Sequence, residues 1–209
     1  MIVYGDNEAY PSVNITNGCT NNCVFCNLQK QVKKYKEKSW FYLEKEPSFE
    51  EVWNEVQKID FSKVKEFWIA GAGEPTLRLD DIVLPLLRKL EVRTSMITNG
   101  HANMIYPDRN VAKELKQAGL HDIEISLNAE NPEKYVKLCR PRLNYSPEEI
   151  YLKIVEFACD CKNNGIYTRL TLVTCISPEL VDGKFMPDVD EFEKITEELE
   201  ITTKKRVFA

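Results

Sequence analysis

The chain has 209 residues, 43% of them hydrophobic, and a formal net charge of −5. This length suits one sizeable core, so we expect a single domain over residues 1–209. The acidic balance gives no overall attraction to nucleic acid or to an anionic membrane surface. The N-terminus lacks the build of a signal peptide, and no apolar run approaches the roughly 20 residues of a membrane span. We therefore expect a cytoplasmic protein without a membrane partner.

Seven cysteines are an odd number for a disulfide framework, which favours a reducing compartment. Strand and helix patterns then alternate along the chain, which indicates repeated βα units and a parallel sheet. Apolar or alternating stretches predict six strands, at residues 13–16, 67–70, 92–97, 123–127, 166–173 and 206–209. The sequence therefore predicts an α/β fold.

Capping signals mark the helices between these strands. They are a capping box at Ser48 and Glu51, Asp80 or Asp81 before a helix that reaches Leu90, Asn110 before a helix that ends at Gly119, Asn131-Pro132 before a short helix, Ser146 before a long helix that Gly165 stops, and a last helix carrying Val189, Phe192, Ile195 and Leu199.

Three cysteines lie close together after the first predicted strand, in the run Cys19-Thr-Asn-Asn-Cys23-Val-Phe-Cys26. Thiolates at this spacing suit three corners of an iron-sulfur cube, which normally has four cysteine ligands. The missing fourth ligand would leave one iron open to bind a substrate or cofactor directly. Two other interpretations stay open: structural thiols, and three ligands of a zinc site that a distant histidine completes.

Polar residues follow each predicted strand up to the fifth. The cysteines follow the first strand, residues 71–75 the second and residues 98–100 the third, while residues 126–128 and 174–175 end the fourth and fifth. The C-terminal ends of the strands of a βα barrel converge on one mouth. We therefore expect a shared pocket there, with barrel-rim loops of no function as the alternative.

The cysteine spacing, with the aromatic Phe25 just before the last cysteine, resembles the cluster loop of the radical S-adenosylmethionine (radical SAM) superfamily. The resemblance spans most of the chain and implies a partial (βα)6 TIM-like barrel. Residues 14–17, 71–77 and 126–131 are more narrowly similar to the small TatD-associated radical SAM proteins. Gly18 departs from the pattern, because relatives often carry a basic residue before the first cysteine.

The resemblance implies two cofactors, a 4Fe-4S cluster held by Cys19, Cys23 and Cys26, and S-adenosylmethionine (SAM) chelated by the free iron. An electron from the reduced cluster would cleave SAM to a 5'-deoxyadenosyl radical, which acts on an unidentified substrate. The partners implied are therefore SAM, an external one-electron reductant and that substrate. A zinc-stabilised or electron-transfer iron-sulfur module without its own reaction is the alternative function.

The resemblance also assigns residues to SAM. Gly73 lets backbone approach a ligand closely, and the carboxylate of Glu74 suits the ammonium group of SAM. A cation for the SAM carboxylate would come from Arg169 or Arg140, although Arg169 facing the outer helices is the alternative. The residues expected to bind SAM are Phe25, Gly73, Glu74, Pro75, Thr98, Asn99, Ser126, Asn128 and Arg169.

The other cysteines are expected to be buried thiols or small hydrophobic residues, not iron ligands. Cys161 lies on the apolar stripe of its helix, whereas Cys139 and Cys175 lie near the predicted rim, where contact with substrate is the alternative. His101 is expected to be a solvated loop histidine, with an acid or base at the mouth as the alternative.

A basic run lies between Lys30 and Lys38 and is followed by the aromatic residues 40–42. Basic residues next to aromatic ones are one signature of nucleic-acid binding. Because acidic residues interrupt the charges on both sides, we expect a solvated extension of the cysteine loop and no nucleic-acid partner.

Overall fold

The computed structural model describes residues 2–5, 7–26, 42–177 and 179–207. In these residues one seven-stranded sheet has the order β1-β2-β3-β4-β5-β6-β7. The strands are β1 (Val3–Tyr4), β2 (Ser12–Val13), β3 (Phe67–Ile69), β4 (Thr94–Thr98), β5 (Asp122–Ser126), β6 (Tyr167–Thr174) and β7 (Thr202–Val207). β1 pairs antiparallel with β2, and all later pairs are parallel. The linear order leaves the sheet open, as expected for a partial (βα)6 TIM-like barrel.

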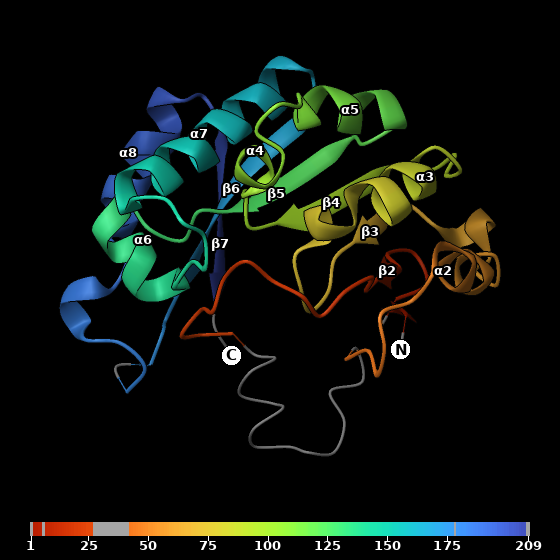
Figure 1. The fold of residues 1–209 in the computed structure, drawn as a ribbon, viewed down its shortest axis with the longest axis horizontal. Helices are drawn as coiled ribbons and strands as arrows, with labels where there is room; N and C mark the ends of the chain where they lie inside the picture. The colour runs from red at the N-terminus through yellow and green to blue at the C-terminus, as the bar shows by residue number, and fades with distance from the viewer. Residues whose placement is uncertain (1, 6, 27–41, 178, 208–209) are drawn as a thin grey trace.

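Helices connect the parallel strands, and α3, α5 and α7 cover one face of the sheet (Figure 1). The α-helices of the described residues are α2 (Phe49–Val56), α3 (Leu84–Leu87), α4 (Ala102–Ile105), α5 (Val111–Ala118), α6 (Pro132–Cys139), α7 (Pro147–Asn163) and α8 (Val189–Glu198). Shorter turns are the 3-10 helices η1 (Phe61–Lys63), η2 (Pro75–Arg78) and η4 (Gly183–Phe185) and the π-helix η3 (Leu79–Val83).

The predicted caps at Ser48, Asn110, Asn131 and Ser146 are confirmed. Ser48 begins α2 with a capping box, and Ser146 does the same for α7. Gly119 follows α5 with a φ of 111°, in the left-handed region that glycine adopts without strain. These contacts lie within one helical turn, which is why the sequence alone was enough to predict them.

Several boundary predictions were wrong, among them that of the first strand, which was expected over residues 13–16 and is observed at Ser12–Val13. The helix expected from Asp80 begins earlier, because Glu74 caps η2 and Pro75 supplies its first residue, and α3 ends at Leu87. The last strand begins at Thr202 instead of residue 206. The start of this strand was not recognised because its sequence is polar. β7 is an edge strand with little apolar burial. β1 and α4, each short, were missed.

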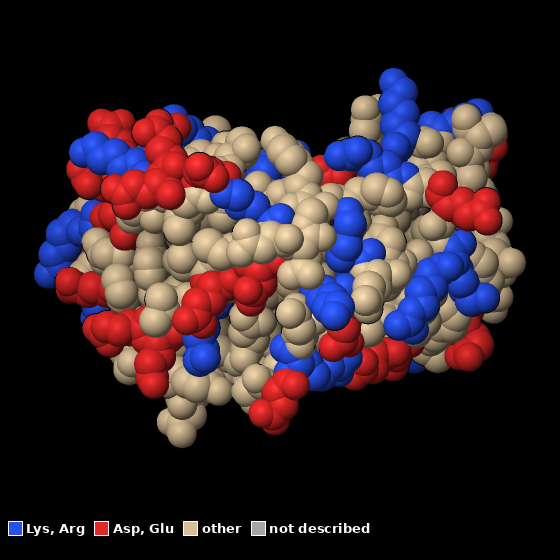
Figure 2. Space-filling model, turned by 90° about the horizontal axis from the view of Figure 1, so that it is seen from above, with Lys and Arg blue, Asp and Glu red and all other residues tan. Residues whose placement is uncertain are grey.

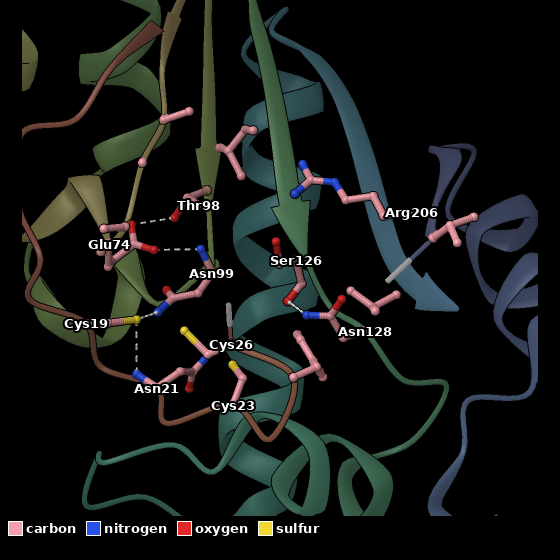
Figure 3. A pocket seen from close by; sticks show the side chains of 18 of the residues that line it. Cys19, Asn21, Cys23, Cys26, Glu74, Thr98, Asn99, Ser126, Asn128 and Arg206 are labelled. Carbon is pink, nitrogen blue, oxygen red and sulfur yellow. Dashed lines mark hydrogen bonds between the residues drawn. The ribbon is translucent and has the colours of Figure 1, made fainter. Parts of the chain in front are cut away.

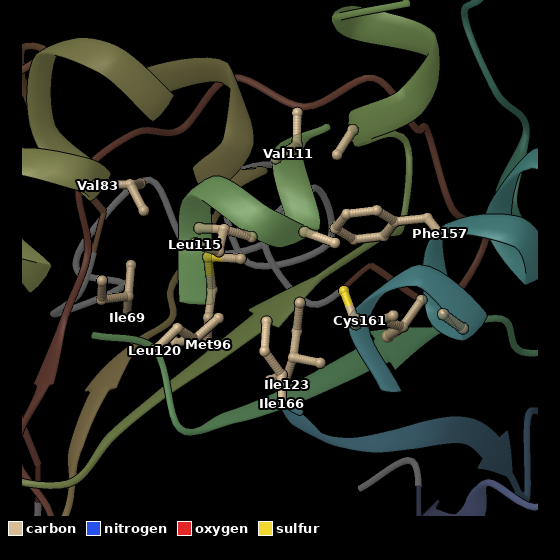
Figure 4. Packing of buried hydrophobic residues seen from close by; sticks show 14 of the residues in the cluster. Ile69, Val83, Met96, Val111, Leu115, Leu120, Ile123, Phe157, Cys161 and Ile166 are labelled. Carbon is tan, nitrogen blue, oxygen red and sulfur yellow. The ribbon is translucent and has the colours of Figure 1, made fainter. Parts of the chain in front are cut away.

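The hydrophobic core lies between the sheet and the helices of its outer face (Figure 4). Met96 and Ile123 of the sheet meet Leu115 of α5 and Phe157 of α7, and all four are fully buried. A fully buried side chain of this kind stabilises the fold by about 1.5–3 kcal/mol. Cys161 is buried in this layer, as its place on the apolar stripe predicted. The opposite face of the sheet is consequently left for polar side chains.

The basic run and aromatic residues 40 and 41 lie outside the described residues. Within the described ranges, no helix is long and apolar enough to cross a membrane. On the face seen in Figure 2, Lys and Arg side chains alternate with Asp and Glu side chains, and neither sign forms a continuous area.

Candidate functional site

A cavity of about 380 Å³ lies at the C-terminal ends of the parallel strands. Its wall combines the three cysteines of the loop after β2 with residues that end or follow β3 to β7 (Figure 3). Ala70, Asn99, Ser126, Val173 and Arg206 represent these five strands in the wall. The expected shared pocket at the strand ends is therefore present.

The end of α6 holds the cysteine loop in place. The backbone N–H of Asn22 donates to the carbonyl oxygens of Cys139 and Arg140, at 3.0 and 3.1 Å, and that of Val24 donates to Leu138 at 2.9 Å. The last carbonyls of a helix have no partner inside the helix. Here the loop supplies those partners, so α6 fixes the position of the three thiols.

The surroundings of the loop raise the pKa of two of its thiols, Cys19 and Cys23. Burial raises the pKa of Cys19 to about 12. A hydrogen bond with Cys139, together with burial, raises the pKa of Cys23 well above its usual value. Two groups donate toward the sulfur of Cys19: the backbone N–H of Asn21 at 3.4 Å and the side-chain amide of Asn99 at 3.8 Å. Metal binding at these sulfurs must therefore release protons.

The donor set fits an iron-sulfur cube with one iron left open, because three thiols of one loop supply three of the four cysteine ligands that a cube normally has. Asn21 and Asn128 belong to the cavity wall, and the amide oxygen of each is buried without a partner in the described structure. Such oxygens require a donor, as a polar cofactor would supply.

Glu74 lines the cavity, but its carboxylate is bound by the protein itself. Oε1 accepts from the backbone N–H and hydroxyl of Thr76, at 3.0 and 2.8 Å, and from the hydroxyl of Thr98 at 2.6 Å. Oε2 accepts from the backbone N–H of Asn99 at 2.6 Å. Burial raises the pKa of Glu74 although these four bonds oppose the shift. The carboxylate therefore ties the turn after β3 to the end of β4.

Gly73 is required by a contact inside the protein. Its backbone N–H donates to the carbonyl oxygen of Thr16 at 3.0 Å, and that of Glu74 donates to Gly18 at 2.7 Å. A Cβ atom on Gly73 would lie 2.1 Å from the carbonyl oxygen of Gly18. The close backbone approach expected toward a ligand is thus made here to the cysteine loop.

The structure brings together most of the residues expected to bind SAM. The cavity wall contains Phe25, Gly73, Glu74, Thr98, Asn99, Ser126 and Asn128. Asn128 adopts a φ of 58°, which asparagine tolerates better than most side chains, and its amide nitrogen donates to the Ser126 carbonyl oxygen at 3.2 Å. Two expected residues are not in the wall: Pro75 is buried at the start of η2, and Arg169 lies deeper on β6.

Arg169 is neither at the cofactor end of the cavity nor directed at the outer helices. Its guanidinium pairs with Glu124 of β5, with an N–O distance of 3.0 Å. The cation found in the cavity wall is Arg206 of β7. Sequence reasoning missed it because the short polar strand was placed too late, and the run Lys204-Lys205-Arg206 has no alternation that would mark an inward face.

His101 is fully buried, so the expectation of a solvated histidine was wrong. Its ring nitrogens form hydrogen bonds of 2.7 Å with the hydroxyls of Thr20 and Tyr135. Burial lowers the pKa of His101 to about 3. The neutral ring therefore links the cysteine loop to α6. The contact of Cys139 with Cys23 also went unrecognised in the sequence.

The family model of the Radical SAM superfamily matches residues 13–174. An uncharacterized protein of Methanocaldococcus jannaschii is 30% identical over 172 residues, which cover 80% of this chain and 37% of the relative. GTP 3',8-cyclase of Aliarcobacter butzleri is 26% identical over 192 residues, covering 90% and 53%. This chain thus spans about half or less of the length of these relatives.

Among solved structures, Streptococcus suis SuiB bound to S-adenosylmethionine superposes with a TM-score of 0.65. The identity is 17%, and the match covers 95% of this chain and 40% of SuiB. At this identity the likeness concerns the fold. The family model, by contrast, covers the cysteine loop and the strands β3 to β6 of the cavity wall. The chain belongs to the Radical SAM superfamily, whose enzymes use a 4Fe-4S cluster and S-adenosylmethionine.

Proposed function

We propose that this chain binds a 4Fe-4S cluster through Cys19, Cys23 and Cys26 and reductively cleaves SAM in the adjoining cavity. One observation carries the proposal: three thiols of a single loop share a cavity with the ends of five parallel strands. The volume, about 380 Å³, lies within the range of roughly 300–1,000 Å³ usual for small-molecule sites.

The side chains of this cavity have distinct tasks under this proposal. Asn21 and Asn128 would accept hydrogen bonds from the ammonium or hydroxyl groups of SAM, because their amide oxygens are buried without a partner in the described residues. Asn99 donates toward the sulfur of Cys19 and would stabilise its thiolate form. The apolar side chains of Ile97 and Val173 complete the wall and limit the access of water.

The cluster and SAM together supply the difficult step, in which an electron cleaves SAM to methionine and a 5'-deoxyadenosyl radical. The protein contributes binding and orientation, and an external one-electron reductant would supply the electron. The substrate on which the radical acts is not specified by the fold. A single domain over residues 1–209, the narrower likeness to TatD-associated proteins and a cytoplasmic location stay predictions. Seven unpaired thiols are consistent with a reducing compartment.

The decisive experiment is anaerobic reconstitution with iron and sulfide, followed by reduction with dithionite in the presence of SAM. We expect the absorption of an iron-sulfur cluster and equal amounts of methionine and 5'-deoxyadenosine. The variant with Cys19, Cys23 and Cys26 all replaced by Ala serves as the control and should give neither. A reducible cluster without SAM cleavage would favour electron transfer, and tight binding of zinc without cluster assembly would favour the zinc module; each result would overturn the proposal.

A further inference from the structure

The inner face of the sheet carries an unusual group of charges around Glu124 of β5. Its carboxylate is almost completely buried, with a side-chain exposure of 1%. It accepts from Lys204 at 2.7 Å, from Arg206 at 2.5 Å and from Arg169 at 3.0 Å. Successive side chains of a β-strand point to opposite faces of the sheet. Lys204 and Arg206 are two residues apart on β7 and therefore point to the same face.

One carboxylate does not balance three cations, so this cluster has two positive charges in excess. Asp122, which is next on the same side of β5, is paired with Arg93 at 2.8 Å, and Arg93 also lies 4.0 Å from Glu66, so these neighbours carry one net negative charge and reduce the excess to one positive charge. Arg169 also has a buried Nε–H without a partner in the described residues. If the cations served only to neutralise Glu124, one of them would be enough. The excess is notable in a chain whose net charge is −5.

The positive group opens into the cavity through Arg206. Figure 3 shows the cysteines at one end of the cavity and Arg206 at the other, with Ser126 between them. Within the described structure Arg206 directs one side-chain donation to Glu124. Its guanidinium has five N–H donors in a planar fork, which matches phosphate and carboxylate oxygens. Donors of Arg206 are therefore available to a ligand in the cavity.

Lys204 lies two residues before Arg206 on β7, outside the cavity wall, and its side chain is 44% exposed. Its ammonium group lies 5.8 Å from the ring centroid of Trp68, which is on β3, four strands away in the sheet. This contact between strands that are not neighbours shows that the sheet curves and that the cationic group lies inside the curve. Partial enclosure strengthens electrostatic attraction relative to an exposed surface.

We propose that the Arg206 end of the cavity binds an oxyanion of the substrate, a phosphate or carboxylate group, with Arg169 and Lys204 adding to the positive field. This inference rests on the proposed function, because it places the substrate opposite the cysteines. The proposed substrate is therefore an anionic compound.

The test uses the reconstituted protein with SAM bound and inorganic pyrophosphate as the probe, with binding followed by calorimetry at low salt. We expect saturable binding, weakened about tenfold or more in Arg206→Gln, since a hydrogen bond to a charged group is lost. Arg206→Lys should restore part of the affinity. Lys205→Gln is the matched control, because Lys205 is on the same strand but pairs with Glu193 on the outer side, and should bind as the wild type does.

Glu124 keeps Lys204 and Arg169 as partners in Arg206→Gln, so this variant should fold, which thermal unfolding checks. Arg169→Gln is the second variant and should also weaken pyrophosphate binding. Equal pyrophosphate binding by wild type and both variants would overturn the inference. So would competition between pyrophosphate and SAM with a loss of SAM affinity in Arg206→Gln, because the arginine would then serve the carboxylate of SAM. A failure of the proposed function appears separately, as absent SAM cleavage in the wild type without pyrophosphate.

Discussion

Replacing Glu74 with Gln tests whether this carboxylate acts as a clamp within the protein. Its two oxygens accept backbone N–H groups on opposite sides, from Thr76 on Oε1 and from Asn99 on Oε2. A Gln side chain has the same shape but one acceptor oxygen. If that oxygen keeps the three donors of Oε1, the amide nitrogen faces the N–H of Asn99, which cannot reverse its direction. One buried N–H group is then left without an acceptor.

The cost of an unsatisfied buried donor is about 1–3 kcal/mol. Taking about 2 kcal/mol, and about 2–4 °C per kcal/mol for a chain of this size, we expect Glu74→Gln to lower the Tm by about 4–8 °C. The assay is thermal unfolding followed by circular dichroism. Glu156→Gln is the control, because Glu156 is exposed on α7, and its Tm should match that of the wild type.

Glu74→Gln should also keep the iron content after reconstitution while weakening SAM binding, because the turn that it anchors forms part of the cavity wall. The two readouts separate two roles. An unchanged Tm with weaker SAM binding would refute the clamp and indicate direct contact of the carboxylate with the ammonium group. A lower Tm with unchanged SAM affinity would remove Glu74 from the cofactor site.

Three further predictions concern the cluster and the charges beneath it. Replacing any one of the three loop cysteines with Ala should abolish cluster iron. The control Cys139→Ala removes the thiol beside Cys23 and should retain the iron. The iron content and the absorbance of each variant are measured after reconstitution. The reconstituted chain should contain about four irons, and a value near eight would reveal a second cluster. Burial alone would raise the pKa of Glu124, but the hydrogen bond from Lys204 and the charge of Arg206 outweigh it and lower the pKa. Its stabilisation is therefore present above the pKa of the unfolded chain, about 4.3, and is lost as the pH falls through the lower pKa of the folded state. Glu124→Gln should lose less stability between pH 5 and acid than the wild type in urea unfolding, and parallel losses would contradict this assignment.

The sequence by itself determined the features that depend on near neighbours in the chain. The cysteine spacing predicted the loop and its metal chemistry, and the caps at Ser48, Asn110 and Ser146 predicted where helices begin. The alternation of strands and helices predicted an α/β fold with a parallel sheet, and parallel connections place the C-terminal strand ends on one rim. Each of these signals acts over one turn, one strand or one βα unit.

Only the tertiary structure decided which distant groups meet. The sequence predicted that the Glu74 carboxylate contacts a cofactor. In the structure β3 and β4 are neighbours, so the carboxylate after β3 accepts a hydrogen bond from the backbone N–H of Asn99 after β4. His101 is buried between the cysteine loop and α6, where Thr20 and Tyr135 contact its ring, and no local sequence pattern predicts this. Arg206 replaced Arg169 in the cavity wall because β7 pairs beside β6 and extends its side chain to the rim. Such contacts depend on strand register and on the curvature of the sheet, and these are properties of the whole chain.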